Sequence, residues 1–140
     1  GNAVDPLIGA IPGGDDSPAR LHQRIRAEQR DPAWAPVTEQ ALHTVYSRVE
    51  HVGGPNNPLR IMCATTLCEV AGTIDAPASK TDEESLRTPL NRTLQALQGK
   101  LLQDDLAKSG LEHVSGFFGG GKPGQTAFLQ YWSRKGATLK

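Results

Sequence analysis

The chain has 140 residues, and its 15 basic and 15 acidic side chains give a formal net charge of zero at pH 7. This balance argues against a protein that binds nucleic acid or an anionic membrane surface by electrostatic attraction. No apolar run reaches the roughly 18 residues of a membrane-spanning helix, so we expect no transmembrane segment.

The composition changes after the first sixteen residues, which are rich in glycine, proline and aspartate, as turns and linkers are. We therefore expect residues 1–16 to be a disordered lead-in or linker. The remaining length suits one domain with its own hydrophobic core. We expect residues 17–140 to form that single domain.

Two helix starts follow, each a capping residue and then a proline, which fits the first helical position. The first lies at Ser17 and opens a short helix with a narrow apolar stripe, ending at about Arg30. The second lies at Asp31 and opens a helix whose apolar residues recur at spacings of three and four. These residues are Trp34, Val37, Ala41, Leu42, Val45, Tyr46 and Val49.

The only two cysteines, Cys63 and Cys68, flank a candidate two-residue turn, Thr65-Thr66. In a hairpin they would face each other as a non-hydrogen-bonded pair, whose short Cα separation suits a disulfide. A disulfide indicates an oxidising compartment. The alternative is a reduced cytosolic protein with two buried thiols.

A third helix is expected to begin at Thr81 or at Thr88 and to end at Gly110. Gly99 lies inside this stretch and allows a break there, because glycine costs about 1 kcal/mol relative to alanine in a helix. Leucines mark the side expected to be buried. They are Leu86, Leu90, Leu94, Leu97 and Leu101.

Two segments rich in aromatic and β-branched residues, 111–118 and 126–134, are expected to form a second hairpin around a glycine-rich loop. The expected element order is α-α-β-β-α-β-β. Two hairpins separated by a long helix predict one antiparallel sheet with helices packed on one face, a two-layer α+β domain. The glycine-rich loop resembles a phosphate-binding loop, but Pro123 replaces the residue that would ligate magnesium, so we expect no cofactor.

The ionisable residues do not converge along the sequence on one reaction. The four histidines lack metal-ligand spacing, so no metal site is predicted. A small hydrolase assembled in the fold around His113, with Glu69 and Ser115 as partners, stays open as an alternative. No G-x-S-x-G nucleophile elbow supports a catalytic serine.

The run Arg-Asp-Pro-Ala-Trp-Ala at 30–35, followed by Glu39 and Leu42 and then by the cysteine segment 63–70, resembles a pattern in uncharacterised exported proteins of proteobacteria. The resemblance covers about a third of the chain. It implies a cell-envelope setting, with a tryptophan-led helix beside a cysteine-clasped hairpin, and no assigned activity. We expect a periplasmic or extracellular protein whose export signal or anchor has been removed.

We therefore expect a binding or accessory module of the cell envelope without intrinsic catalysis. Strand alternation sends Met62, Leu67 and Glu69 away from the helices. The last strand is expected to expose either Phe128 and Trp132 or Leu129 and Tyr131. An exposed apolar patch of this kind typically marks a contact surface, here for a second copy of the chain or another envelope protein. The alternative is that the N-terminal helix or the lead-in covers this face.

Overall fold

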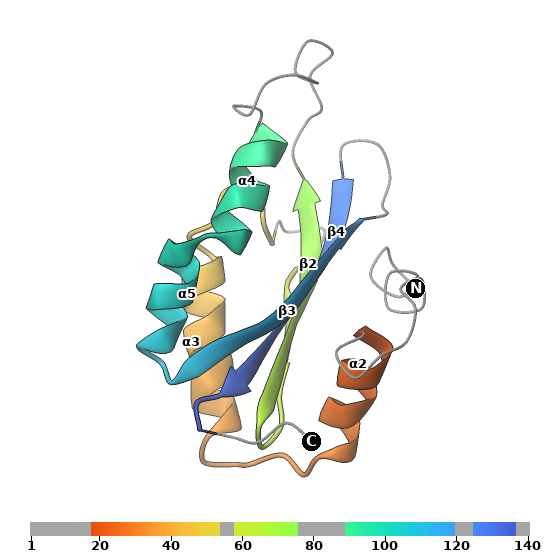
Figure 1. Ribbon diagram of the computed structural model, residues 1–140, viewed down its shortest axis with the longest axis vertical. Coiled ribbons are helices and arrows are strands. Elements are labelled where there is room, and N and C mark those ends of the chain that lie inside the picture. The colour runs from red at the N-terminus through yellow and green to blue at the C-terminus, as the bar shows by residue number, and fades with distance from the viewer. Residues whose placement is uncertain (1–17, 54–57, 76–88, 120–124, 137–140) are drawn as a thin grey trace.

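The computed structural model describes residues 18–53, 58–75, 89–119 and 125–136. Four helices and four strands lie within these ranges (Figure 1). The helices are α2 (Pro18–Ala27), α3 (Ala35–Tyr46), α4 (Pro89–Gln98) and α5 (Lys100–Ala107). The strands are β1 (Arg60–Cys63), β2 (Leu67–Asp75), β3 (Leu111–Gly119) and β4 (Gln125–Arg134).

The strands form one antiparallel sheet in the order β1-β2-β4-β3, so the second hairpin lies beside the first. This confirms the expected α+β class and the sheet of two hairpins. The third helix is divided at Gly99, which gives the order α-α-β-β-α-α-β-β. The lead-in, the alternative start at Thr81 and Leu86 lie outside the described residues.

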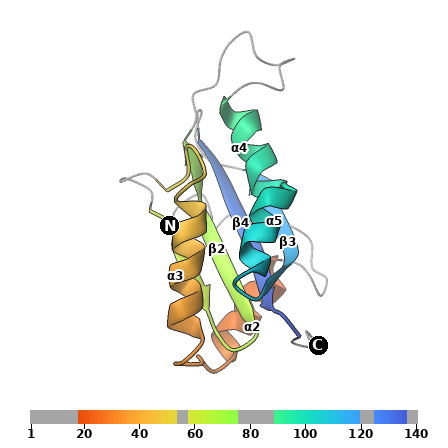
Figure 2. The same cartoon turned by 90° about the vertical axis from the view of Figure 1, so that its left-hand side faces the viewer.

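Helices cover both faces of the sheet, which differs from the expected packing on one face (Figures 1 and 2). Helices α3, α4 and α5 lie on one side, which we call the broad face, and α2 lies on the other, the narrow face. The cause is visible in the two central strands. In β2 every residue from Leu67 to Ile74 is buried, and in β4 every residue from Ala127 to Ser133, so both of their faces need a cover.

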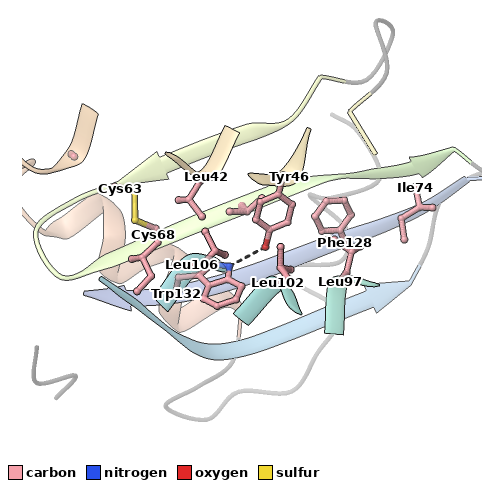
Figure 3. Close-up of a cluster of buried hydrophobic side chains, with 13 residues drawn as sticks. Leu42, Tyr46, Cys63, Cys68, Ile74, Leu97, Leu102, Leu106, Phe128 and Trp132 are labelled. Carbon is pink, nitrogen blue, oxygen red and sulfur yellow. Dashed lines mark hydrogen bonds between the residues drawn. A yellow bond between two sulfur atoms is a disulfide. The ribbon is translucent and has the colours of Figure 1, made fainter. Parts of the chain in front are cut away.

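The core of the broad face contains a chain of buried polar groups that joins the sheet to two helices. Figure 3 shows its first bond, between Trp132 and Tyr46, among the apolar side chains of this core. Trp132 Nε1 donates to the Tyr46 hydroxyl at 2.9 Å, and that hydroxyl donates to Gln130 Oε1. Gln130 Nε2 in turn donates to the carbonyl oxygen of Leu97 at 2.7 Å. Burial raises the pKa of Tyr46, which keeps its hydroxyl protonated. These buried polar groups therefore have partners, as a stable interior requires.

Two apolar side chains assigned to the core are in fact exposed, Val37 at 70% and Leu101 at 83%. Val37 does not belong to the buried side of α3, which is formed by Ala35, Thr38, Leu42 and Tyr46. Leu101 is exposed because the chain is extended at Gly99 (φ −85°, ψ 166°), so the stripe of α4 does not continue into α5. Leu102 and Leu106 provide the buried side of α5 instead.

The narrow face is closed by α2, whose Leu21 and Ile25 pack on the sheet. Leu67 is fully buried and Glu69 is only 4% exposed beneath this helix, while Met62 is half-buried. The expected exposure of Leu67 and Glu69 is therefore wrong, because the N-terminal helix covers this face, as the alternative expectation had it. The expected exposure of aromatic residues on the last strand is wrong too. Phe128, Leu129, Tyr131 and Trp132 are all fully buried.

Candidate functional site

The disulfide hairpin has the predicted register. Cys63 pairs with Cys68 across β1 and β2, their sulfurs are bonded and their Cα atoms are 4.0 Å apart. The Ala64 N–H donates to the Leu67 carbonyl at 3.0 Å, which closes the turn over residues 65–66. Both cysteines are buried, at 1% and 0% exposure, which suits a structural bond rather than a redox-active one.

An ion pair holds this hairpin from the side of α3. The Arg30 guanidinium donates to both carboxylate oxygens of Glu39, at 2.6 and 2.7 Å. Glu39 also accepts from the Cys63 N–H at 2.8 Å. Burial alone would raise the pKa of Glu39, but these hydrogen bonds more than offset it and hold the pKa below its usual range.

Asp31 and Trp34 form a second contact at the same corner. Asp31 Oδ1 accepts from the N–H groups of Ala33 and Trp34 at 2.9 and 3.1 Å, which fixes the turn before α3. The helix itself begins at Ala35, later than the start expected at Asp31. Its Oδ2 accepts from Arg134 at 3.1 Å, and the Arg134 guanidinium lies 4.8 Å from the centre of the Trp34 ring. The spacing of this motif is therefore explained by packing, without invoking catalysis.

The turn is held from the narrow face as well. Glu28, just after α2, accepts at Oε1 from the N–H groups of Thr65 and Thr66, at 3.1 and 3.0 Å, while its Oε2 accepts from the Thr66 hydroxyl. Burial opposes the ionisation of Glu28, but these hydrogen bonds hold its pKa below the usual range. The hairpin tip is thus anchored by one carboxylate on each side.

The three residues proposed for a hydrolase do not converge. The His113 ring lies edge-on to Trp132 of the broad-face core, with ring centres 5.1 Å apart. Ser115 lies on the opposite face, because the ring of Phe117, two residues further along β3, contacts Tyr131 of the narrow-face cluster. A β-bulge between His113 and Ser115 reverses the alternation that would have put both on one face.

Glu69 instead meets a histidine that the sequence analysis did not select. His22 Nδ1 lies 2.6 Å from Glu69 Oε2, and the Tyr131 hydroxyl donates to the same oxygen at 2.8 Å. Arg26 Nη1 lies 3.9 Å from Glu69 Oε1. Burial, together with the charge of Glu69, raises the pKa of Tyr131, so this hydroxyl remains a donor. We call these four residues the Glu69 cluster.

The Glu69 cluster contains a histidine paired with a carboxylate, an arrangement that also occurs in general-base catalysis. Here, however, the carboxylate is 4% exposed and lies between the sheet and α2. His22 and Arg26 both belong to α2, so their contacts tie this helix to β2. The geometry therefore assigns the Glu69 cluster to the attachment of α2.

A pocket of about 500 Å³ opens on the other side of the molecule, between the end of α3 and the divided helix. Figure 2 shows α3 beside α4 and α5 on this face. The Thr93 hydroxyl donates to the Glu50 carbonyl at 2.9 Å and joins two of its walls. We call it the α4–α5 pocket. It is lined by Arg48, Val49, Glu50, Arg92, Thr93, Gln95, Ala96, Gly99, Lys100, Leu101, Leu102 and Asp105.

This pocket was not predicted from the sequence, although the possible break at Gly99 was a signal for it. A Cβ at Gly99 would lie 2.9 Å from the Gln95 carbonyl oxygen, so glycine suits the close approach at the break. The break also leaves Leu101 exposed at the pocket wall.

Comparison of the chain with protein-family models, with curated proteins and with solved structures finds no match. Within the described ranges, no group of three or more histidine, cysteine, aspartate or glutamate side chains could hold a metal ion. No helix in those same ranges combines the length and the apolar character needed to cross a bilayer.

Proposed function

We propose that this chain is a binding module of the cell envelope or extracellular space, and that the α4–α5 pocket is its binding site. The observation that carries the proposal is a pocket of about 500 Å³, open in the folded chain, with mostly apolar walls. Small-molecule sites typically have about 300–1,000 Å³ and such walls, with a few polar groups to orient the ligand.

The lining favours binding over nucleophilic catalysis. Thr93 carries the one hydroxyl among the lining residues, and this hydroxyl already donates to the Glu50 carbonyl. No histidine or cysteine lines the pocket to serve as base or nucleophile. His113 lies on the other face of the sheet from Glu69 and Ser115, which argues against the hydrolase alternative.

The disulfide supports a location outside the reducing cytosol, because such bonds persist mainly in oxidising compartments. Both cysteines of this bond are buried, which suits a structural role. The periplasmic or extracellular setting is part of the proposal.

A fragment titration followed by amide NMR tests the binding site. We expect apolar fragments to shift the amide signals of residues 48–50 and 92–102, and Leu101→Gln to weaken that binding by removing apolar wall. The matched control is Val37→Gln, because Val37 is also an exposed apolar residue on a helix but lies outside the pocket. Fragments that bind only elsewhere, or equal losses in both variants, would contradict the proposal.

A further inference from the structure

The α4–α5 pocket has positively charged side chains that its acidic residues do not neutralise. The inference drawn from these charges rests on the proposed function. Of the two acidic residues in the lining, Glu50 Oε2 lies 4.0 Å from Arg92 Nη2. The other, Asp105, lies with Oδ1 3.8 Å from Lys108 Nζ. Both carboxylates thus have a cation beside them.

Arg48 and Lys100 line the same pocket and form no ion pair with any other described residue. Both are exposed, which keeps their side chains solvated. They stand next to apolar wall residues, Arg48 beside Val49 and Lys100 beside Leu101. The pocket therefore combines an apolar interior with positive charge at its edge.

The backbone contributes in the same direction. Helix α5 begins at Lys100, and its N-cap, Gly99, has no side chain to accept from the first N–H groups. These N–H groups give the start of a helix a partial positive charge. Because residues 99–102 line the pocket, this charge adds to that of the two cations.

From these charges and walls we infer that the pocket binds an amphiphilic anion, a molecule with a compact apolar body and one anionic head group. The apolar body would cover Leu101 and the neighbouring walls, and Arg48 and Lys100 would attract the head group. Free organic acids and the head groups of anionic lipids share this chemistry. A cationic amphiphile of equal size would gain the same apolar contact but meet like charges.

Three probes with apolar tails of the same length separate the apolar contribution to binding from the electrostatic one. They are octanoate, octanol and octylammonium. Octanoate should shift the amide signals of residues 96–102 and bind about tenfold more tightly than octylammonium, a difference of about 1.4 kcal/mol. Raising the salt concentration from about 50 to about 500 mM should weaken the binding of octanoate and leave the binding of octanol unchanged. The double variant Arg48→Gln, Lys100→Gln should remove the preference for octanoate while octanol still binds.

Lys135→Gln is the matched control, because Lys135 is an exposed cation outside the pocket. Sedimentation with phosphatidylcholine vesicles containing phosphatidylglycerol tests the lipid source. Vesicle binding that the double variant loses would identify a lipid head group, and its absence beside octanoate binding would identify a free acid.

The failures of the two proposals are distinguishable. Equal affinity for octanoate, octanol and octylammonium in the pocket would overturn the anion inference and leave the binding site intact. If octanoate does not bind while other fragments shift the pocket signals, the anion inference is likewise overturned and the binding site stays intact. If neither the octyl probes nor the fragment library shifts those signals, the proposed binding site itself is wrong.

Discussion

The two faces of the sheet are closed by different means. On the broad face three helices enclose an apolar core with Trp132 and Tyr46 near its centre. On the narrow face one helix of ten residues contributes three buried residues, Pro18, Leu21 and Ile25. It is also attached through buried Glu69 and through the contacts of Glu28 with the hairpin turn. One cover is therefore held by packing, and the other depends largely on polar contacts.

This difference has a physical consequence for local stability. Elements with few buried apolar contacts open at lower free energy than the rest of a domain. Helix α2 has that character, whereas α3 and α5 share the main core. We therefore expect α2 to open before the broad face does.

The largest effect is expected on the broad face. Leu42 is fully buried in α3, and Leu42→Ala should lower the free energy of unfolding by about 3 kcal/mol, because it leaves a cavity in the main core. Urea unfolding followed by circular dichroism measures this loss. Val37→Ala on the same helix is the control and should change stability by less than about 0.5 kcal/mol. Equal effects of the two substitutions would mean that α3 is placed wrongly.

A smaller effect is expected from Glu69→Gln on the narrow face, about 2 kcal/mol, because the amide keeps the shape but weakens the bonds to Tyr131 and His22. Hydrogen exchange should show a greater loss of protection in α2 than in α3. The control is Glu50→Gln, since the Glu50 side chain is 70% exposed. Equal losses in both helices would show that α2 opens only with the whole domain.

The smallest effect concerns the hairpin turn, which both faces hold. The pKa values of Glu28 and Glu39 are lowered in the folded chain, so the unfolded chain binds more protons as the pH falls. Their contribution is present above about pH 4.5 and is lost as the pH falls through the folded-state pKa values. Urea unfolding between about pH 7 and pH 3 should show this loss.

Each variant should flatten part of that pH dependence. Glu28→Gln removes the contribution from the narrow face, and Glu39→Gln removes the one from the broad face. Glu112→Gln, at an exposed position of β3, should retain the full loss. A Glu28 or Glu39 variant with the same pH dependence as the Glu112 variant would show that the turn contacts do not stabilise the fold.

Local rules predicted the parts of the fold that local chemistry determines. Proline at the start of α2 and the Thr65-Thr66 turn each act within a few residues, and the structure has both. The break at Gly99 was only an allowed possibility within one expected helix, and the structure has it too. The cysteine register followed from the turn length alone, because a two-residue turn fixes which residues face each other.

The placement of α2 depended on longer-range packing. Its stripe of Leu21 and Ile25 suits either face of the sheet, so the stripe alone does not choose one. The available signal was the apolar character of β2, since a run without polar alternation indicates a strand buried on both faces. Glu69 interrupts that run, and a buried carboxylate needs partners, which His22 and Arg26 on the same side of α2 provide.

The candidate sites were harder to predict, for two reasons. A β-bulge between His113 and Ser115 has no local signature in the sequence, yet it places their side chains on opposite faces. The pocket forms where the end of α3 meets the break at Gly99, and these two points are far apart along the chain. A spacing rule cannot find a cavity whose walls come from separate segments.

The strand order has a consequence for the speed of folding. Each hairpin can form from neighbours in sequence, but the sheet is complete only when β2 pairs with β4, joining Leu67 to Ser133 and Asp75 to Gln125. Closing so long a loop costs chain entropy before the native contacts that offset this cost have formed. Such long-range pairings slow folding. The disulfide holds β1 against β2 in the correct register throughout that search. A chain oxidised early therefore enters the slow step with half of its sheet already aligned.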